Sequence, residues 1–198
     1  METISTILLF FYLFFMLLAA GYGILSYVLT SRGIQTIADR RGIKHAWMAW
    51  LPVVNGWVLG SISDQYQQVT RFKSKRKRVA LLILQIVAYA LTIIMVISLI
   101  LVELQAGSLS NGMNSESMIG SLAVFLLSYF GMLGVGIAYT VIYYIALYDL
   151  YASCKPNSAA LYLVLTLVVN VTTPFLVFSC RKKDMGMGAI RPRVRSNW

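Results

Sequence analysis

Charged residues are scarce in this 198-residue chain: Asp, Glu, Lys and Arg make up 12% of it, while hydrophobic residues make up 59%. Soluble globular domains are about 25% charged and roughly 45–50% apolar. The shortage of charge therefore excludes a water-soluble fold and predicts an all-α integral membrane protein. Because one spanning helix takes about 20 apolar residues, we expect a single membrane domain over residues 1–198 and no separate soluble domain.

Residues that ligate metals or perform acid–base chemistry are also few. The chain has one histidine, His45, and two cysteines, Cys154 and Cys180, which form no CxxC pattern. This set argues against a zinc site and a disulfide framework, and it predicts free thiols. No phosphate-binding Gly-rich loop, HExxH or GxSxG pattern occurs. We therefore expect no metal, no cofactor and no enzymatic activity.

Three stretches contain no charge and are long enough to cross a bilayer: residues 4–30, 79–102 and 118–148. The shortest would form a helix of about 36 Å, compared with a hydrocarbon thickness of about 30 Å. A cleaved signal peptide is the alternative for the first stretch. Such a peptide begins with basic residues, whereas Met1–Thr3 contains no Lys or Arg. We therefore expect three retained transmembrane helices.

Two further apolar stretches, 47–63 and 158–180, are interrupted by residues that break helices. The interruptions are Pro52, Asn55 and Gly56 in the first stretch, and Asn170, Thr172 and Pro174 in the second. In hydrocarbon, the backbone groups freed by such residues must be satisfied by protein or water. Both stretches are therefore predicted to be re-entrant or half-spanning helical segments.

The distribution of positive charge decides between topologies. Lys and Arg number 17, against 7 Asp and Glu, and cationic loops tend to stay in the cytoplasm. If both interrupted stretches return to the side they left, all 17 cations lie on one face. If 158–180 crosses instead, the basic tail 181–198 is separated from the other cations, which gives the alternative of four transmembrane helices. We expect three spans, an outside N-terminus and a cytoplasmic C-terminal tail.

Residues 31–46 are polar and basic, with apolar residues at helical spacing ahead of Gly42. They fit either a short helix on the membrane surface or a solvated loop. A denser basic block follows at residues 64–78, in which six cations stand within eight positions. These are Arg71, Lys73, Lys75, Arg76, Lys77 and Arg78. The block predicts a cytoplasmic flank that also contacts anionic lipid headgroups. The cluster of six cations adjoins a span and has Phe72 as its only interleaved aromatic residue, so nucleic-acid binding is not expected.

Asn55 and Asn170, beside Pro52 and Pro174, are the candidate site residues. Broken helices at corresponding positions of two halves are the usual indication of a substrate site at the bilayer midplane. The alternative is structural, with each asparagine hydrogen-bonded to backbone that its neighbouring proline frees. The two halves are loosely alike, which leaves an internal duplication open.

Three aspartates fall near the expected cytoplasmic boundary: Asp64, Asp149 and Asp184. A three-carboxylate cation site can be drawn from them, but solvated, charge-balancing carboxylates are the better interpretation. In the third span, Gly131, Gly134 and Ala138 allow another helix to approach closely. A band of tyrosines from Tyr139 onward is typical of an interfacial anchor.

The string RRGIKHAWMAWLPVVNGWVLGSISDQY, with YDLYASCKPNSAALYLV and RKKDMGM, resembles a group of small, uncharacterised multi-pass membrane proteins of Gram-positive, mainly clostridial, bacteria. The likeness covers most of the chain and is most specific from Gly42 to Tyr66. It implies a bacterial plasma membrane and assigns no functional residue.

Two functions remain open. One is a small transporter or permease-like component with a midplane site. The other is a non-transporting scaffold or regulatory subunit that binds a partner membrane protein, a second copy of the chain or anionic lipid. The lipid bilayer itself is the partner expected in either case.

Overall fold

The chain is built from helices over the part that the structure describes. The computed structural model describes residues 2–72, 76–108, 115–183 and 185–187, and no strand occurs within these ranges. The elements are α1 (Glu2–Arg40), η1 (Ala46–Trp50), α2 (Asn55–Arg71), α3 (Lys77–Ser108), α4 (Ser115–Cys154), η3 (Pro156–Ser158), α5 (Ala159–Val168), η4 (Asn170–Thr172) and α6 (Thr173–Cys180). The predicted all-α fold is confirmed.

Three helices are long and apolar enough to cross a membrane, as predicted. They cover Thr6–Arg40 in α1, Lys77–Gln105 in α3 and Ile119–Cys154 in α4. Each continues past the apolar run from which it was predicted. Even the 29-residue segment of α3 is about 43 Å long at 1.5 Å per residue, so every one of these helices exceeds the hydrocarbon thickness.

The prediction for residues 31–46 is wrong, because α1 continues without a break to Arg40. The apolar residues of this segment, Ile34, Ile37 and Ala38, are at most 1% exposed and extend the helix by packing into the core. Gly42 then ends the helix with a positive φ of 70°. The Ile43 amide donates to Ala38 O and the Gly42 amide to Asp39 O, which is a Schellman motif.

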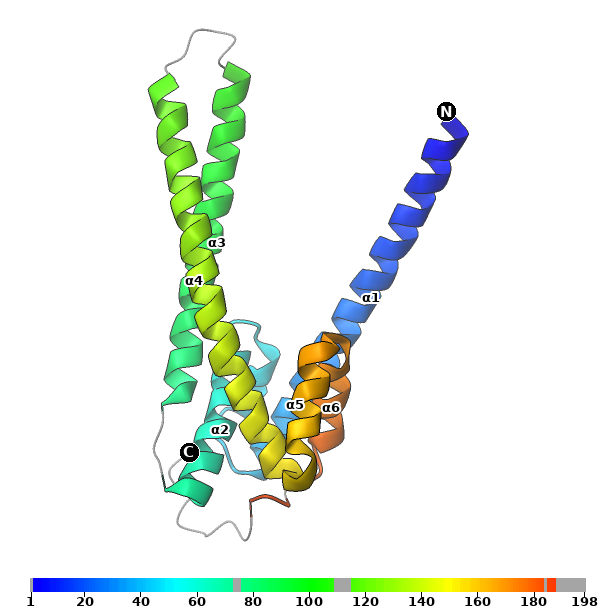
Figure 1. The fold of residues 1–198 in the computed structure, drawn as a ribbon, viewed down its shortest axis with the longest axis vertical. Helices are drawn as coiled ribbons and strands as arrows, with labels where there is room; N and C mark the ends of the chain where they lie inside the picture. Colours follow the sequence, from blue (N-terminus) through cyan, green and yellow to red (C-terminus); the bar gives the residue numbers. More distant parts are fainter. Residues whose placement is uncertain (1, 73–75, 109–114, 184, 188–198) are drawn as a thin grey trace.

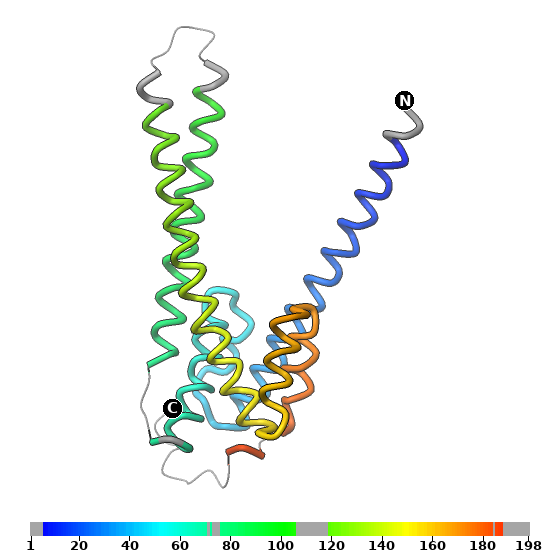
Figure 2. The backbone as a smooth tube through the Cα atoms, viewed as in Figure 1, coloured from blue at the N-terminus to red at the C-terminus, as the bar shows by residue number. Residues whose placement is uncertain are grey.

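The three long helices form a V that is open at one end (Figure 1). The start of α1, the end of α3 and the start of α4 lie at the open end. The end of α1, the start of α3 and the end of α4 lie at the other end, which we call the base. The tube in Figure 2 shows α1 diverging from the α3–α4 pair as it leaves the base.

Two short hairpins pack at the base, one after α1 and one after α4. In the first, η1 and α2 are joined by residues 51–54, and α2 returns to the base before α3 begins. In the second, α5 rises from the base and α6 returns to it. Arg40 Nη1 donates to Arg181 O at 3.0 Å, so the end of α6 lies beside the end of α1. Residues 158–180 therefore form a hairpin of two short helices and not one continuous helix.

The second hairpin turns where its sequence is polar. At Val169 (φ −125°, ψ 79°) the chain leaves the helical conformation, and Pro174 stands in the first turn of α6, where its missing N–H costs nothing. The Thr172 hydroxyl donates to Val169 O at 2.8 Å and so satisfies a carbonyl at the turn. The ten residues of α5 are about 15 Å long, half of a hydrocarbon core.

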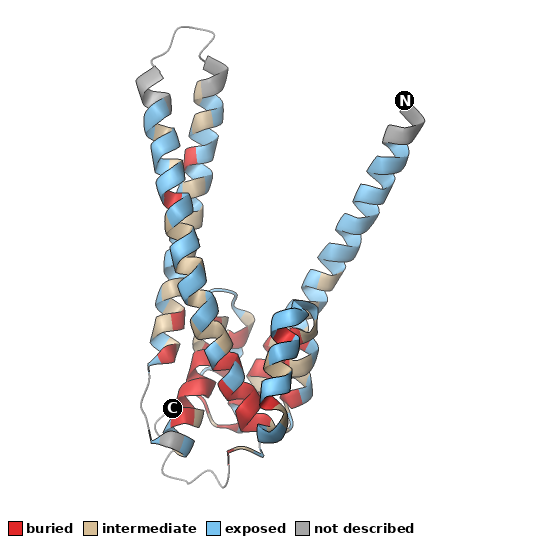
Figure 3. Cartoon of the chain, viewed as in Figure 1, coloured by how far each residue is buried: buried red, intermediate tan, exposed pale blue. Residues whose placement is uncertain are grey.

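Buried side chains gather at the base, while the open end of the V is exposed (Figure 3). The hydrophobic core joins α1, α2, α4 and α6, and includes Ile34, Ile37, Val58, Leu59, Ile62, Leu147, Leu150 and Val177. Cys154 and Cys180 are free and buried in the same region, as predicted for free thiols. The base is thus the one part of the described chain that has a protein core of its own.

The chain that follows α6 packs back onto the end of α4. The Gly186 amide donates to Ser153 O at 2.9 Å, and the Met185 amide to Cys154 O at 3.3 Å. A Cβ on Gly186 would lie 2.1 Å from Ala152 O, so any other residue here would force the backbone to shift. The first part of the basic tail is therefore a structured part of the base. Residues 188–198 of the predicted tail lie outside the described residues.

Candidate functional site

Two of the four predicted site residues line one cavity. They are Pro52, in the turn of the first hairpin, and Asn55, the first residue of α2. Both line a cavity of about 220 Å³ between the long helices. The other lining residues are Tyr27 and Thr30 of α1, Gly56 of α2, Gln85 of α3, and Tyr139 and Tyr143 of α4. Four elements that are distant in sequence therefore contribute polar side chains to the same space.

Four of these polar side chains have no hydrogen-bond partner among the described residues. They are the amides of Asn55 and Gln85 and the hydroxyls of Tyr139 and Tyr143. The rings of Tyr139 and Tyr143 are stacked, with centroids 5.8 Å apart and an interplanar angle of 20°. All four side chains are partly exposed, so their polar atoms face the cavity and are available to whatever fills it.

The α1 wall of the cavity is held by hydrogen bonds to η1. The Tyr27 hydroxyl donates to Trp50 O, and the Trp50 indole N–H donates to Gln35 Oε1 at 2.7 Å. The guanidinium of Arg32 lies 5.7 Å from the centre of the Trp50 ring, within reach of a cation–π contact. These contacts fix the first hairpin against α1 and so fix the position of Pro52 and Asn55.

The other two predicted residues, Asn170 and Pro174, do not line this cavity. They lie at the turn of the second hairpin, where Asn170 Oδ1 accepts a hydrogen bond from the Thr173 hydroxyl at 3.2 Å. The Tyr22 hydroxyl of α1 donates to Val171 O at 2.9 Å beside them. Asn170 therefore has a local partner in the turn, whereas Asn55 has none in the described chain.

Below the cavity, the base contains a buried ion pair. Lys77 Nζ, at the start of α3, lies 2.5 Å from Asp149 Oδ2 of α4, and the two side chains are 10% and 4% exposed. Asp149 also accepts hydrogen bonds from Ser63 Oγ at 2.5 Å and from Gln67 Nε2 at 3.0 Å, both on α2. The pair therefore joins α2, α3 and α4 at one point.

A second buried carboxylate, Asp64, caps the N-terminus of α3. It accepts the backbone N–H groups of Lys77 at 3.0 Å and Arg78 at 3.2 Å, which no residue within α3 can satisfy. Burial raises the pKa of Asp64 above its ordinary value, and the two backbone donors and nearby cations oppose part of that shift. Asp64 is the residue by which α2 holds the first turn of α3.

The prediction of solvated aspartates is therefore wrong for Asp64 and Asp149, which are 4% and 3% exposed. Each is buried because α3 begins with backbone donors and a lysine that need acceptors. Asp184 lies outside the described residues. In the part that the structure describes, no three His, Cys, Asp or Glu side chains are grouped so that they could hold a metal ion.

The residues predicted to contact anionic lipid have different environments. Lys77 is ion-paired with Asp149, Arg76 is exposed and Arg78 is partly buried. Lys73 and Lys75 lie outside the described residues, and the side chain of Arg71 is not described either. Among the six cations, Arg76 is thus the one whose side chain the structure describes as exposed.

Comparison of the chain with protein-family models, with curated proteins and with solved structures finds no match. The resemblance to small clostridial membrane proteins therefore remains a prediction. The three apolar helices fit a membrane protein, and any more specific function has to be argued from the geometry of the chain itself.

Several residues of the cavity were not predicted as site residues. Gln85 stands out in sequence as an amide inside the apolar run 79–102, and a polar side chain within a span is a sequence signal of a functional site. Tyr139 and Tyr143 were predicted as interfacial anchors, because tyrosines at the end of a long helix generally are. Their place in the cavity depends on how α4 crosses α3 and α2, which the sequence pattern does not give.

Proposed function

We propose that the chain is a permease-like component of a bacterial plasma membrane that holds an uncharged, polar chemical group in the cavity of Asn55, Gln85, Tyr139 and Tyr143. The proposal depends on one observation. Four polar side chains from three helices face the same space without a partner in the described chain. A buried or membrane-embedded polar group left without a hydrogen bond costs about 1–3 kcal/mol, so a site with four of them favours an occupant.

Other polar side chains in the same helices support this interpretation by contrast. Thr92 donates to Ala88 O, and Ser128 donates to Val124 O, both at 2.8 Å. These side chains satisfy themselves on their own helix, which is the ordinary solution in a membrane. The polar groups of the cavity do not, although a glutamine or a tyrosine in an apolar helix has the same need for a partner.

The depth of the cavity fits a site within the bilayer. Gln85 stands eight residues after Lys77, and Tyr139 stands ten residues before Asp149. At 1.5 Å per residue, the cavity is about 12–15 Å above the buried ion pair. If the ion pair marks the cytoplasmic boundary, this depth is near the midplane of a 30 Å hydrocarbon core.

The hairpin tips support insertion of both hairpins into hydrocarbon. The first tip exposes Leu51 and Val53, at 42% and 38%, and the second exposes Val168 and Val171, at 72% and 54%. Apolar tips on hairpins with basic ends are expected of re-entrant segments that enter from one side and return to it. The proposal therefore includes both hairpins as re-entrant.

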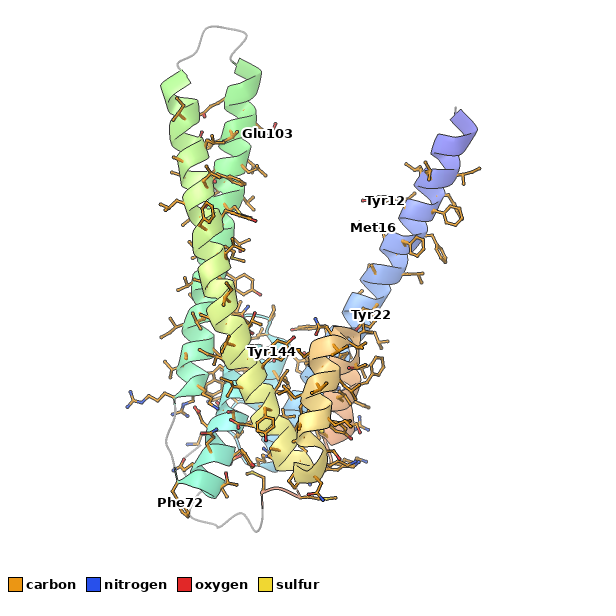
Figure 4. All side chains as sticks on the ribbon, in the orientation of Figure 1. Tyr12, Met16, Tyr22, Phe72, Glu103 and Tyr144 are labelled. Carbon is orange, nitrogen blue, oxygen red and sulfur yellow. The ribbon has the colours of Figure 1, made fainter. Side chains whose placement is uncertain are left out.

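The charges at the base support an orientation with this end in the cytoplasm. Arg40, Arg41, Lys77, Lys155 and Arg181 all lie there, while Glu103 lies near the open end, as labelled in Figure 4. The positive-inside tendency then supports an outside N-terminus.

A scaffold is the second candidate, and it is favoured by the open face of α4. Nothing lies within 4 Å of the position that a Cβ would take on Gly134, and Ala138, one turn further on, is exposed, whereas Gly131 packs against Leu91 of α3. A small-residue face that is open in the single chain is suited to close approach by another helix.

Cysteine accessibility distinguishes the two functions. Single cysteines at Gln85 and Asn55, in a Cys154→Ala, Cys180→Ala background, are treated in membrane vesicles with a water-soluble, membrane-impermeant thiol reagent. A polar cavity that exchanges solute predicts reaction at both positions, because the thiolate that reacts needs water. Ile83→Cys, on the exposed apolar side of α3, is the matched control and is expected not to react. If Gln85→Cys and Asn55→Cys are as unreactive as Ile83→Cys, water does not reach the cavity, and the result favours a scaffold over a permease-like component.

A further inference from the structure

We infer that the group held in the cavity is the uncharged, hydroxyl-bearing headgroup of a lipid, which enters sideways from the bilayer between α1 and α4. This inference rests on the proposed function, since it assumes that the cavity binds a polar group. It adds the chemical class of the ligand and its route of entry.

The first observation is that protein does not cover α1 above the cavity. Tyr22 contacts the second hairpin, but every other α1 side chain from Thr6 to Leu25 is exposed to the surroundings. Ile24 and Leu25, for example, are 69% and 49% exposed. α1 packs against η1, α2 and α6, whereas α3 and α4 pack against each other. Tyr12 and Met16 accordingly stand clear of the rest of the chain in Figure 4. In a membrane, the space above the cavity on this side is filled by lipid.

The second observation is an apolar groove on α4, one helical turn from two of the residues that line the cavity. The groove has a volume of about 330 Å³ and is lined by Met132, Leu133, Gly136, Ile137, Thr140 and Val141. Gly136 and Thr140 stand three positions before Tyr139 and Tyr143, so they are the surface neighbours of these tyrosines on the helix. An acyl chain lying in the groove would therefore lead to the cavity.

The third observation is that the cavity carries no charge. Its lining residues are tyrosine, threonine, asparagine, glutamine, proline and glycine. The charged groups around it lie outside this lining: Arg32 is exposed and lies over the Trp50 ring, and Lys77 and Asp149 of the base are paired with each other. A phosphate or an ammonium group would be desolvated there without a counter-charge in the lining, which is strongly unfavourable. Hydroxyl groups both donate and accept hydrogen bonds, and so match two amides and two phenols.

The fourth observation is size. A cavity of about 220 Å³ corresponds to roughly seven water molecules at 30 Å³ each. This volume accommodates a glycerol unit or one sugar ring, and the stacked tyrosines offer a flat apolar surface to either. It is too small for acyl chains as well, so the tail of such a ligand has to lie outside the cavity, against the groove on α4 and the exposed side of α1.

Photo-crosslinking tests the inference on the full-length protein in phosphatidylcholine nanodiscs. The probes are a photoactivatable diacylglycerol, its monohexosyl derivative and a photoactivatable phosphatidylglycerol, and the labelled peptides are identified by mass spectrometry. We expect the two uncharged probes to label peptides of α1 and α4 beside the cavity. Removing two hydroxyls with Tyr139→Phe plus Tyr143→Phe should reduce this labelling about 5- to 50-fold, at about 1 kcal/mol for each hydrogen bond. Tyr129→Phe, an exposed α4 tyrosine outside the cavity, should leave it unchanged.

A second pair of variants tests the position of the tail. Gly136→Leu fills the groove without a clash, since nothing lies within 4 Å of its Cβ position, and should reduce labelling by the uncharged lipids several-fold. Gly134→Leu is equally open but is not a lining residue of the groove, and should have a much smaller effect. Equal labelling by phosphatidylglycerol, or equal effects of the two glycine variants, would overturn the inference and indicate only surrounding lipid.

If a soluble hexose or glycerol protects Gln85→Cys from the thiol reagent while no lipid probe is specific, the inference fails and the proposed function stands. If Gln85→Cys is also unreactive, both fail.

Discussion

Removing one partner of the Lys77–Asp149 ion pair should destabilise the base, and the two partners should not be equivalent. Asp149 accepts hydrogen bonds from Lys77, Ser63 and Gln67, so it retains two donors when the lysine is lost. The Lys77 ammonium has Asp149 as its only salt-bridge partner in the described chain, and Ser63 Oγ at 3.2 Å is its other acceptor. Asp149→Asn therefore leaves a buried positive charge, whereas Lys77→Met leaves a carboxylate that is still hydrogen-bonded.

The magnitude follows from burial. Breaking a buried pair by removing one partner costs about 3–5 kcal/mol, and these side chains are 10% and 4% exposed. We expect Asp149→Asn to reach that range and Lys77→Met to cost about half as much. The double variant should cost less than the sum, with a coupling energy of about 1–3 kcal/mol. At about 2–4 °C per kcal/mol, Asp149→Asn should lower the melting temperature by roughly 10 °C.

The two buried thiols provide the assay. A fluorogenic maleimide that reacts with Cys154 and Cys180 only when the base opens reports unfolding directly, in detergent and without an engineered cysteine. Arg76→Met removes an exposed cation from the same segment as Lys77 and is the control, with an expected change within about 0.5 kcal/mol. Equal effects of Arg76→Met and Asp149→Asn, or strict additivity in the double variant, would refute the reasoning.

Three further predictions concern the same region. Gly186→Ala should destabilise the base by about 1–3 kcal/mol, since its Cβ would lie 2.1 Å from a carbonyl oxygen of α4, and the thiol melting assay should show it. Gly60→Ala should also destabilise the base, because its Cβ would lie 2.5 Å from Arg78 Cα. Gly134→Ala, whose Cβ position is open, is the control and should be neutral or stabilising. A neutral Gly60→Ala would show that α2 and α3 can separate. Burial raises the pKa of Asp64 above 3.8, so the folded protein binds this proton more tightly than the unfolded chain. The contribution of Asp64 to the free energy of unfolding is therefore complete in acid and is lost as the pH rises through the raised pKa. The melting temperature of the wild type relative to Asp64→Asn should fall as the pH rises from about 4. A rise over that interval would contradict the assignment.

The architecture could largely be predicted because its signals are local and strong. Long uncharged runs predict spanning helices from composition alone, and the proline and asparagine at 52–55 and 170–174 mark the places where two helices cannot continue. The same local signals misled at 31–46. Basic residues there suggested the membrane surface, but Ile34, Ile37 and Ala38 bury one face of α1 against the base.

The candidate site could be predicted only in part. Pro52 and Asn55 break a helix and so stand out in any apolar run, whereas their partners in the cavity lie on α1, α3 and α4. Which side of each long helix faces the cavity depends on packing angles between helices that are apolar all round. The fate of Asp149 was hidden for the same reason: its partners Lys77, Ser63 and Gln67 are 72 to 86 residues away in sequence.

The bare outer part of α1 makes this helix a lever. It is held as far out as Tyr22, whose hydroxyl donates to Val171 O, and Thr6 lies 16 residues, or about 24 Å, further along the axis. A change of about 10° in the tilt of this outer part would therefore move its end by about 4 Å while few protein contacts were lost. Because a helix that is longer than its bilayer adapts by tilting, the angle between α1 and the α3–α4 pair should follow membrane thickness. The width of the lateral entrance above Tyr27 would then be set partly by the surrounding lipid.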